Sequence, residues 1–386
     1  MTTGTIPLGE LVTIRGGGTP SRSISAYWNG AIRWATVKDF KSTELAETEE
    51  SITPEGINES ATNVIPAGSV IVPTRMAVGK AAINTIDLAI NQDLKALLPG
   101  RNVDARFLLH FMVSQGKYLE SQAQGATVKG IKLDLLRSLP FPEISPSEQR
   151  RIASILDKAD AIRRKREQSL ALADDFLRSV FLEIFGDPSA NHKGHPIQQF
   201  GTILLLPLRN GISPSSKGNI SANVLTLTAI TGERFDADQS KEGKFLEPIS
   251  AKDTVSRSDF YICRGNGSPD LIGRGYFADR DMGGTAFPDT MIAAKPNPRK
   301  VTRAYLEKLW NSPFIRNQIR EAARTTNGTF KINQTAAGAI KIPIPPLSDQ
   351  TRYQAIVDQV GQAMSKLAYG DDLFPALSQR AFRGEL

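Results

Sequence analysis

The best match to a catalytic motif in this chain is the octapeptide TRMAVGKA, which begins at Thr74 and has the outline of a phosphate-binding loop. A Walker loop requires glycine where Thr74 stands and serine or threonine where Ala81 stands, so the match fails at both positions. Gly16–Gly18 and the segment GNGSPD, from Gly265, lack the strand-to-helix context of a dinucleotide-binding loop and are typical of turns. The prolines of IPPL, from Ile344, lack the aromatic ring that amino-methyltransferases place beneath an extruded base. We therefore expect no catalytic residues and no enzymatic activity in the isolated chain.

Metal and cofactor sites are not predicted either. Cys263 is the single cysteine, which excludes disulfides within the chain and cysteine-based zinc sites, and we expect it in the core. The three histidines, His110, His192 and His195, are too few for a metal cluster. One alternative stays open: a modifying enzyme whose cofactor site has no recognisable motif. Binding of S-adenosylmethionine by the isolated chain would reveal such a site.

The charge balance favours a polyanionic partner. The 386 residues include 47 Lys and Arg against 40 Asp and Glu, a formal net charge of +7. Basic residues in or beside glycine- and threonine-rich loops could reach phosphates or base edges. These candidate DNA contacts are Arg15, Arg22, Arg33, Lys38, Arg75, Lys80 and Lys129 in the first half of the chain, and Arg209, Arg264, Arg274, Arg324 and Lys331 in the second. For each of them a solvated surface charge is an equally typical role. Four residues recur at matching places in the two halves and are therefore favoured: Thr127, Lys129, Thr329 and Lys331.

One long helix is predicted over residues 146–185. Ser145 can cap it, with Pro146 at the first helical position and Glu148 three residues after the cap. Apolar residues then follow with helical spacing until Gly186 and Pro188 end the run. A helix of this length spans roughly 60 Å, more than the diameter of a small domain, so it must project or bridge. Its single apolar stripe requires a partner helix.

A weaker copy of this helix, which begins SDQTRYQAIVDQV, is the natural partner. Its end, DDLFPALSQRAFRGEL, repeats DDFLRSVFLEIFGD, so Phe382 corresponds to Phe185. Gly361, Gly370 and Pro375 interrupt the copy, and Pro375 is expected to kink or split it. The predicted pairing sets one apolar seam against the other: Ile155, Ile162 and Phe176 against Ile356, Val360 and Leu377.

The duplication extends beyond the helices. LPFP (Leu139–Pro142) precedes the first helix and IPIP (Ile342–Pro345) the second. In both halves β-branched runs such as SVIVPT alternate with helical stretches such as DARFLLHFMVSQGKYLESQA, which predicts a mixed α/β fold. We expect two similar α/β (α+β) domains, each followed by a long helix. The predicted boundaries are 1–145 and 191–346 for the domains, and 146–190 and 347–386 for the helices.

Signals for export or membrane insertion are not found. The first residues lack a positive segment followed by an apolar one, and no run of about 18 apolar residues occurs. We expect a soluble, cytoplasmic protein without a membrane partner.

Three stretches of this sequence closely resemble specificity subunits of type I restriction-modification systems. They are LGELVTIRGGGTPSRSISAYWNGAIRWATVKDF from Leu8, PFPEISPSEQRRIASILDKAD from Pro140 and ALSQRAFRGEL from Ala376. The resemblance covers the whole chain, including the order of its repeats.

The resemblance implies two target recognition domains, each of which reads one half of a split, asymmetric sequence in double-stranded DNA. It also implies that the two helices pair antiparallel, in a pseudo-twofold repeat, and dock two modification (methyltransferase) subunits. Restriction subunits would join through the complex, and the chain itself would need no cofactor or metal. The alternative is a coiled-coil scaffold that joins two protein-binding domains without nucleic acid. The basic charge argues against the scaffold, and retention on heparin would separate the two.

Overall fold

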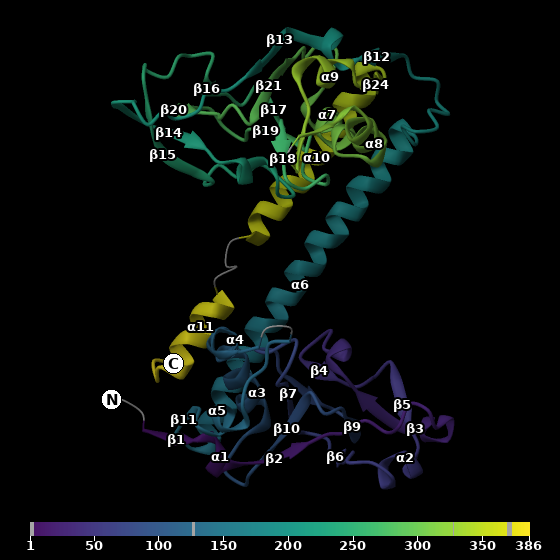
Figure 1. Cartoon of the computed structure of the whole chain (residues 1–386), viewed down its shortest axis with the longest axis vertical. Helices are drawn as coiled ribbons and strands as arrows, with labels where there is room; N and C mark the ends of the chain where they lie inside the picture. Colours follow the sequence, from purple (N-terminus) through teal and green to yellow (C-terminus); the bar gives the residue numbers. More distant parts are fainter. Residues whose placement is uncertain (1–3, 126–127, 327, 369–372) are drawn as a thin grey trace. The chain divides into compact units, whose positions relative to one another are not determined.

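The chain forms two compact units that share one long helix (Figure 1). The computed structural model describes residues 4–125, 128–326, 328–368 and 373–386. Unit 1 comprises Met1–Gln168 and Ala368–Leu386, and unit 2 comprises Ser169–Leu367. Helix α6 (Pro146–Phe185) contributes its first part to unit 1 and its last part to unit 2. None of the helices in the described ranges is both long and apolar enough to cross a membrane.

Unit 1 is a mixed α/β structure built on two larger sheets and a two-stranded one. The larger sheets have the orders β2-β10-β7-β8-β4 and β5-β3-β9-β6, and β1 pairs with β11. The strands are β1 (Thr5–Pro7), β2 (Val12–Gly16), β3 (Trp28–Ala35), β4 (Glu44–Leu45), β5 (Glu50–Ile52), β6 (Val64–Ile65), β7 (Val70–Pro73), β8 (Ala82–Asn84), β9 (Leu88–Ile90), β10 (Leu94–Pro99) and β11 (Pro140–Pro142). The helices apart from α6 are α1 (Leu8–Leu11), α2 (Pro54–Asn58), α3 (Ala105–Ser114), α4 (Gly116–Gln122), α5 (Leu133–Arg137) and, much later in the chain, α11 (Leu373–Phe382).

Unit 2 has the same plan. Its sheets have the orders β13-β21-β17-β19 and β15-β14-β20-β16, β12 pairs with β24, and β18-β23-β22 form a further small sheet. The strands are β12 (Ile197–Gln199), β13 (Leu204–Asn210), β14 (Ile220–Leu225), β15 (Ser240–Phe245), β16 (Thr254–Val255), β17 (Phe260–Cys263), β18 (Gly265–Asn266), β19 (Gly275–Phe277), β20 (Met282–Ala286), β21 (Met291–Pro296), β22 (Arg324–Thr326), β23 (Thr329–Lys331) and β24 (Lys341–Pro343). The helices are α7 (Arg303–Trp310), α8 (Pro313–Ala322), α9 (Gln334–Ala339) and α10 (Leu347–Ala368).

Strand order and strand direction match between the units, except that unit 1 has an additional edge strand, β4, which pairs parallel with β8. In each unit one inner pair is parallel, β3 with β9 and β14 with β20, while the flanking pairs are antiparallel. The predicted internal repeat of two mixed α/β domains is therefore confirmed by the topology. The strand order itself could not be predicted from the sequence.

Helix α6 has the bounds that its capping signals predict. The backbone N–H of Glu148 donates to Ser145 Oγ at 3.3 Å, and Gly186 follows the last helical residue with φ +77°. The Glu148 carboxylate does not complete the capping box, because it forms two hydrogen bonds with the guanidinium of Arg151. The single N-cap bond and the left-handed glycine are sufficient to define the two ends.

The second long helix differs from its prediction. Helix α10 continues without interruption through Gly361, so the predicted break at this residue is wrong. Pro375 lies in the first turn of α11, where a proline is tolerated because its missing N–H would have no partner. Gly370 is outside the described residues.

A buried glutamine joins the start of α6 to the globular part of unit 1. Gln149 is 2% exposed, and its Oε1 accepts from the backbone N–H of Asp104 at 2.8 Å. Its Nε2 donates to the carbonyl oxygens of Asn102 and Ile144 at 2.9 and 3.0 Å. One side chain thus satisfies three backbone groups that would otherwise be buried without partners.

Gln350 makes the same three bonds at the start of α10. It is 0% exposed, accepts from the N–H of Thr302 at 2.9 Å, and donates to the carbonyls of Lys300 and Pro345 at 3.1 and 2.9 Å. The repeat therefore preserves the hydrogen-bonding device that orients each long helix on its domain.

We expect Gln149→Leu to destabilise unit 1 by about 2–4 kcal/mol, because three buried backbone groups lose their partner. Amide hydrogen exchange would show faster exchange in α3 while α7 stays protected, and Gln350→Leu should give the reverse pattern. Gln168 is exposed on α6, so Gln168→Leu is a matched control whose expected effect is below about 0.5 kcal/mol. Protection of α3 at the wild-type level in Gln149→Leu would contradict this account.

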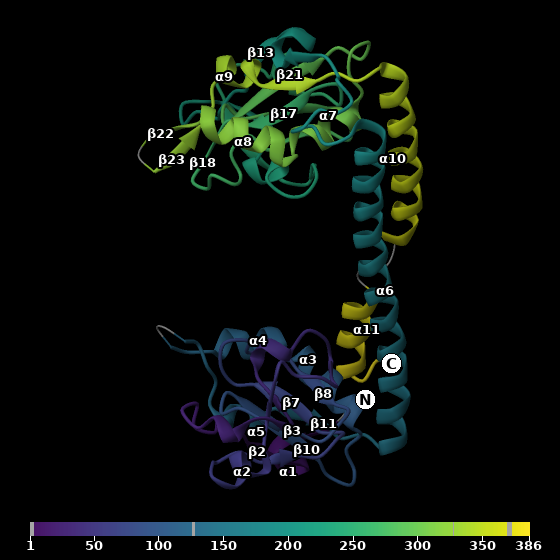
Figure 2. The same ribbon diagram turned by 90° about the vertical axis from the view of Figure 1, so that its right-hand side faces the viewer.

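Each unit is completed by the far end of the helical segment that follows the globular part of the other unit in the chain: α11 in unit 1 and the end of α6 in unit 2. In unit 1, Phe382 of α11 packs against Phe107 of α3, with ring centres 5.4 Å apart. In unit 2, Phe185 of α6 packs against Tyr305 of α7 at 4.7 Å. The correspondence of Phe382 with Phe185 predicted from sequence is therefore present in three dimensions. Figure 2 shows α10 beside the last part of α6 with the opposite chain direction, and Tyr353 of α10 lies 5.6 Å from Phe185.

Candidate nucleic-acid interface

All of the basic candidates in unit 1 have exposed side chains. Arg15 lies on β2, Arg33 on β3 and Lys38 in the turn that follows β3. Arg75 and Lys80 lie in the loop between β7 and β8, and a last candidate, Lys129, lies in the loop after α4. Long exposed cations of this kind can approach a phosphate backbone, although Arg75 lies 3.8 Å from the carboxylate of Asp93.

Arg22 differs from the other candidates of unit 1 because it has strong internal partners. Its guanidinium pairs with both carboxylate oxygens of Glu50 and lies 3.8 Å from the ring centre of Trp28. The hydrogen bonds with Arg22 lower the pKa of Glu50. The indole N–H groups of Trp28 and Trp34 donate to the backbone at Ser21 and Gly18, 3.0 Å in both cases. Arg22 therefore stabilises the loop that follows β2.

In unit 2 three of the basic candidates bond to other segments through their guanidinium groups. Arg209 forms an ion pair with Asp259, and these side chains are 22% and 3% exposed. Arg274 donates to the carbonyls of Thr231 and Gly232, and Arg264 to a carbonyl in the loop before β21, all within 3.0 Å.

The guanidinium groups of these three arginines hold loops of unit 2 together, and their DNA role stays a prediction. Local sequence could not reveal these contacts, because the partners lie 25 to 50 residues away. Arg324 and Lys331, on β22 and β23, remain exposed.

The two favoured lysines occupy different positions in the repeat. In unit 1 Arg75 bridges to Gly130, and in unit 2 Gly265 pairs with Lys331. The next residue in each unit also makes an equivalent bond. The N–H of Ile131 donates to the carbonyl of Thr74, just before Arg75, and the N–H of Ile332 donates to the carbonyl of Arg264, just before Gly265. Gly130 therefore corresponds to Lys331, and Lys129 lies one residue earlier. The predicted match between the lysines is wrong by one position. Thr127 lies outside the described residues, and Thr329 is half-buried at the start of β23.

A groove of about 640 Å³ lies beside these loops in unit 1. It is lined by one guanidinium, two primary amides, an ammonium group and a few apolar side chains: Arg75, Gln122, Gln124, Val128, Gly130, Ile131, Lys132 and Leu135. The backbone of Gln124 is held in place because its N–H donates to the carbonyl of Gly130 at 3.0 Å and its C=O accepts from the N–H of Gly130 at 2.9 Å. Glutamine can bind adenine with two hydrogen bonds and arginine can bind guanine in the same way, so this lining is suited to base edges. The amides were missed because the sequence was searched for cations alone.

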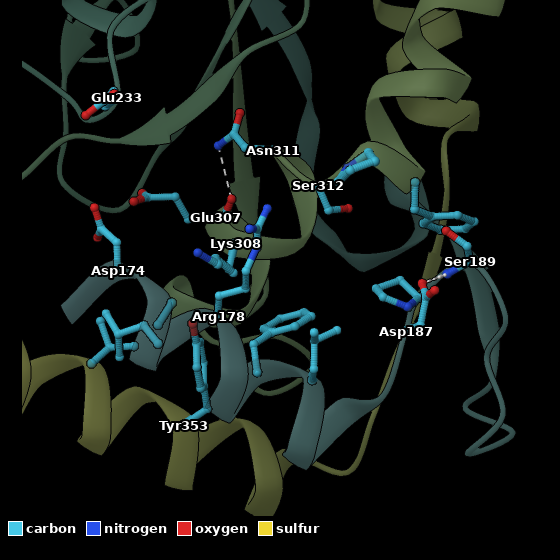
Figure 3. A pocket seen from close by; sticks show the side chains of 18 of the residues that line it. Asp174, Arg178, Asp187, Ser189, Glu233, Glu307, Lys308, Asn311, Ser312 and Tyr353 are labelled. Atoms are coloured by element: carbon cyan, nitrogen blue, oxygen red, sulfur yellow. Dashed lines mark hydrogen bonds between the residues drawn. The ribbon is translucent and has the colours of Figure 1, made fainter. Parts of the chain in front are cut away.

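A second cavity, of about 570 Å³, lies in unit 2 between the last part of α6, α7, α8 and α10 (Figure 3). Its floor is apolar, and its charged groups are Asp174, Asp187, Glu233 and Glu307 against Arg178 and Lys308. Burial raises the pKa of Glu307 and lowers the pKa of Lys308. Carboxylates outnumber cations here, so this cavity does not favour a phosphate backbone.

Comparison with known proteins shows which protein family the first part of the chain is similar to. Residues 2–172 match the family described as type I restriction modification DNA specificity domain. The first part of the chain is therefore similar to type I restriction-modification specificity subunits.

Individual specificity subunits align with different shares of the chain. The EcoR124I/EcoR124II specificity subunit of Escherichia coli is 35% identical over 162 residues, which is 40% of this chain and 40% of that protein. The EcoKI specificity subunit of Escherichia coli K12 is 23% identical over 377 residues, 90% of this chain and 80% of that protein. The S subunit from M. genitalium has the same fold, with a TM-score of 0.59, 14% identity, and coverage of 99% of this chain and 95% of that one. The first of these alignments spans about two fifths of the relative's length.

The burial of apolar residues along the long helices differs from that expected for the predicted seam. Ile162 and Phe176 are 44% and 51% exposed. Ile155, Ile356, Val360 and Leu377 are half-buried. The buried apolar residues of α6 are instead near its two ends: Ile152, Ala153, Leu156, Ala159, Phe181 and Phe185. Helical spacing alone identified an apolar stripe but could not show that the globular parts cover only its ends.

Proposed function

We propose that this chain is the DNA-reading subunit of a type I restriction-modification complex. Each unit contacts one half of a bipartite, asymmetric target in double-stranded DNA. The long helices dock two methyltransferase subunits, through which restriction subunits are recruited. Methyl transfer and cleavage belong to those partners, and this chain supplies the recognition. We place its action in the cytoplasm.

One observation carries this proposal: the two units share a frame and differ in the side chains at equivalent loop positions. The backbone positions occupied by Thr74 and Arg75 in unit 1 are occupied by Arg264 and Gly265 in unit 2. The glutamine anchors are the same in both units, and so is the strand order apart from the edge strand β4 of unit 1. A common frame with different reading residues is suited to a target whose half-sites differ, because bases are read by side chains while the frame sets position.

The direct test is a map of methylated bases in the genome by single-molecule sequencing, with and without this gene. We expect one split sequence to lose its methylation when the gene is removed. Unchanged methylation at every site would reject the proposal. The scaffold alternative would also leave methylation unchanged, and retention of the chain on heparin would then be absent.

The division of basic residues into surface and interior groups gives a second test. Lys331→Gln should leave the free energy of unfolding within about 0.5 kcal/mol of wild type. It should weaken DNA binding to a similar extent on all sequences and reduce the slope of log K against log salt by about one. Arg209→Met should instead cost about 3 kcal/mol of stability, because the buried carboxylate of Asp259 loses its cation.

Urea denaturation and salt titration of DNA binding measure the two effects separately. The double variant Arg209→Met/Asp259→Leu is the matched control and should recover part of the lost stability, since no unpaired charge remains. A change in salt slope for Arg209→Met at temperatures where it is folded would show that Arg209 contacts phosphate after all.

A further inference from the structure

The loop between β7 and β8 contains a residue in an unfavourable backbone conformation. Met76 has φ +63° and is 64% exposed. The other non-glycine residues with positive φ in the described ranges are Asn29 and Asn191. Asparagine tolerates this region because its short polar side chain bonds locally, whereas the methionine side chain has no such compensation. A turn that needed this geometry alone would be better served by glycine or asparagine.

The loop is held firmly around Met76. The Met76 N–H donates to the carbonyl of Lys129 at 3.2 Å, and the Ala77 N–H donates to the carbonyl of Arg75 at 2.8 Å. At Gly79, with φ +94°, a Cβ atom would lie 2.8 Å from the carbonyl oxygen of Gly116 at the start of α4. The loop is thus packed against two other segments, and the strained conformation is maintained by those contacts. Strain that the surroundings enforce is common at ligand-binding sites.

The surroundings of Met76 are polar and basic. Arg75 and Lys80 in the same loop and Lys129 in the neighbouring loop are exposed cations, and the groove with Gln122 and Gln124 begins at Arg75. Two carboxylates lie beside the same loop: that of Asp93 is 3.8 Å from Arg75, and that of Glu120 is 3.0 Å from the Cβ position of Gly79. Cations bind phosphates and amides bind base edges, so an apolar side chain held out among them is placed to contact the bases of a bound duplex.

Unit 2 lacks this feature. By the backbone pairing that aligns Arg75 with Gly265, the residue that corresponds to Met76 is Asn266. Asn266 lies on β18 without a positive φ, and its Oδ1 accepts from the N–H of Ser268 at 2.9 Å. The exposed apolar residue therefore belongs to unit 1 alone.

We infer that Met76 is an apolar base contact through which unit 1 recognises its half of the DNA target. This inference rests on the proposed function and adds a residue that determines specificity. The thioether side chain either packs on the C5-methyl group of a thymine in the major groove or inserts between adjacent base pairs. Both are contacts with bases, and the strained loop holds the side chain ready for them.

The test uses the full chain in its complex with the methyltransferase subunits, and a duplex of the sequence that methylation mapping identifies. We expect Met76→Ala and Met76→Gly to bind this duplex about tenfold more weakly, while Met76→Leu stays within about threefold. The melting temperature of Met76→Gly should be equal to wild type or higher, because glycine adopts positive φ without strain. Ile86→Ala is the matched control: Ile86 is 37% exposed in the same unit, and its variant should bind as wild type does.

The mode of contact is read from the DNA. If Met76 packs on a thymine methyl group, one thymine-to-deoxyuridine replacement in the half-site of unit 1 weakens wild type as much as Met76→Ala does and has no further effect on that variant. If Met76 inserts between base pairs, the fluorescence of 2-aminopurine at one step of that half-site increases when the wild type binds and does not increase when Met76→Ala binds. Wild-type affinity of Met76→Gly would reject the inference while leaving the proposed function intact. Failure of the wild-type complex to bind the mapped duplex would reject both.

Discussion

Exchange of residues 1–145 for the corresponding segment of a specificity subunit should change one half of the methylated sequence and leave the other half intact. The reason is that each unit has its own sheets and loops, so under the proposed function the base contacts of unit 2 do not depend on those of unit 1. The junction lies just before Pro146, and the bonds of Gln149 to the exchanged segment go to backbone atoms, which any sequence supplies. The effect is large, because recognition of every genomic site would switch.

The structure adds one condition to this exchange. Phe382 of α11 packs against Phe107 and Phe111, so the donor segment must present aromatic or large aliphatic residues there. Exchange of residues 191–346 is the matched control and should alter the other half of the target. Methylation mapping of both chimaeras decides the matter: two changed halves from a single exchange would show that the units do not read independently.

Insertion of four helix-forming residues after Arg166 should yield a methylated sequence with both half-sites retained and a longer gap between them. Four residues lengthen a helix by about 6 Å and turn it by roughly 400°, which is a full turn plus about 40°. The buried residues of α6 lie near its ends, and residues 161–180 contain none, so each unit keeps its own packing. We expect the gap to grow by one or two base pairs, at about 3.4 Å per pair.

Insertion of two residues at the same place should abolish modification instead of shifting the gap. Two residues turn the helix by about 200°, so the surfaces on either side of the insertion face opposite directions. Four glycine and serine residues placed after the exposed Glu247, between β15 and β16, control for added length without a change in the helix. An unchanged gap in the four-residue variant would disprove the role of α6 in spacing, and full activity of the two-residue variant would disprove the need for rotational register.

The parts of this structure that could be predicted from the sequence are those encoded by neighbouring residues. The serine cap, the proline at the first helical position and the glycine at the end define α6 through contacts within a few residues. The repeat was visible because Gln149 and Gln350, or Phe185 and Phe382, keep their order along the chain. Their roles as an anchor and as an aromatic contact required the structure, because their partners lie on other segments.

Interior arginines show most clearly why the candidate site could not be derived from sequence. Arg209 and Arg274 follow or precede glycines in the sequence, as expected for DNA-binding loops, yet both bond to segments about 43 to 50 residues away. Conversely, Met76 gave no signal, because a methionine in a sequence does not reveal its φ angle. Both cases have one origin: the contacts of a side chain depend on the segments that the fold brings to it.

The composition of unit 1 has a consequence for the synthesis of the chain. Its core includes Ala381 and contacts with Phe382, and these residues leave the ribosome about 200 residues after Gln168. At typical translation rates Phe107 and Phe111 therefore stay without their contact to Phe382 for roughly 10 to 40 s. All segments of unit 2 are synthesised before Phe382. We expect nascent chains to recruit chaperones to this face, and chains truncated before α11 to be degraded. Such surveillance would ensure that only chains with both long helices in place enter the proposed complex.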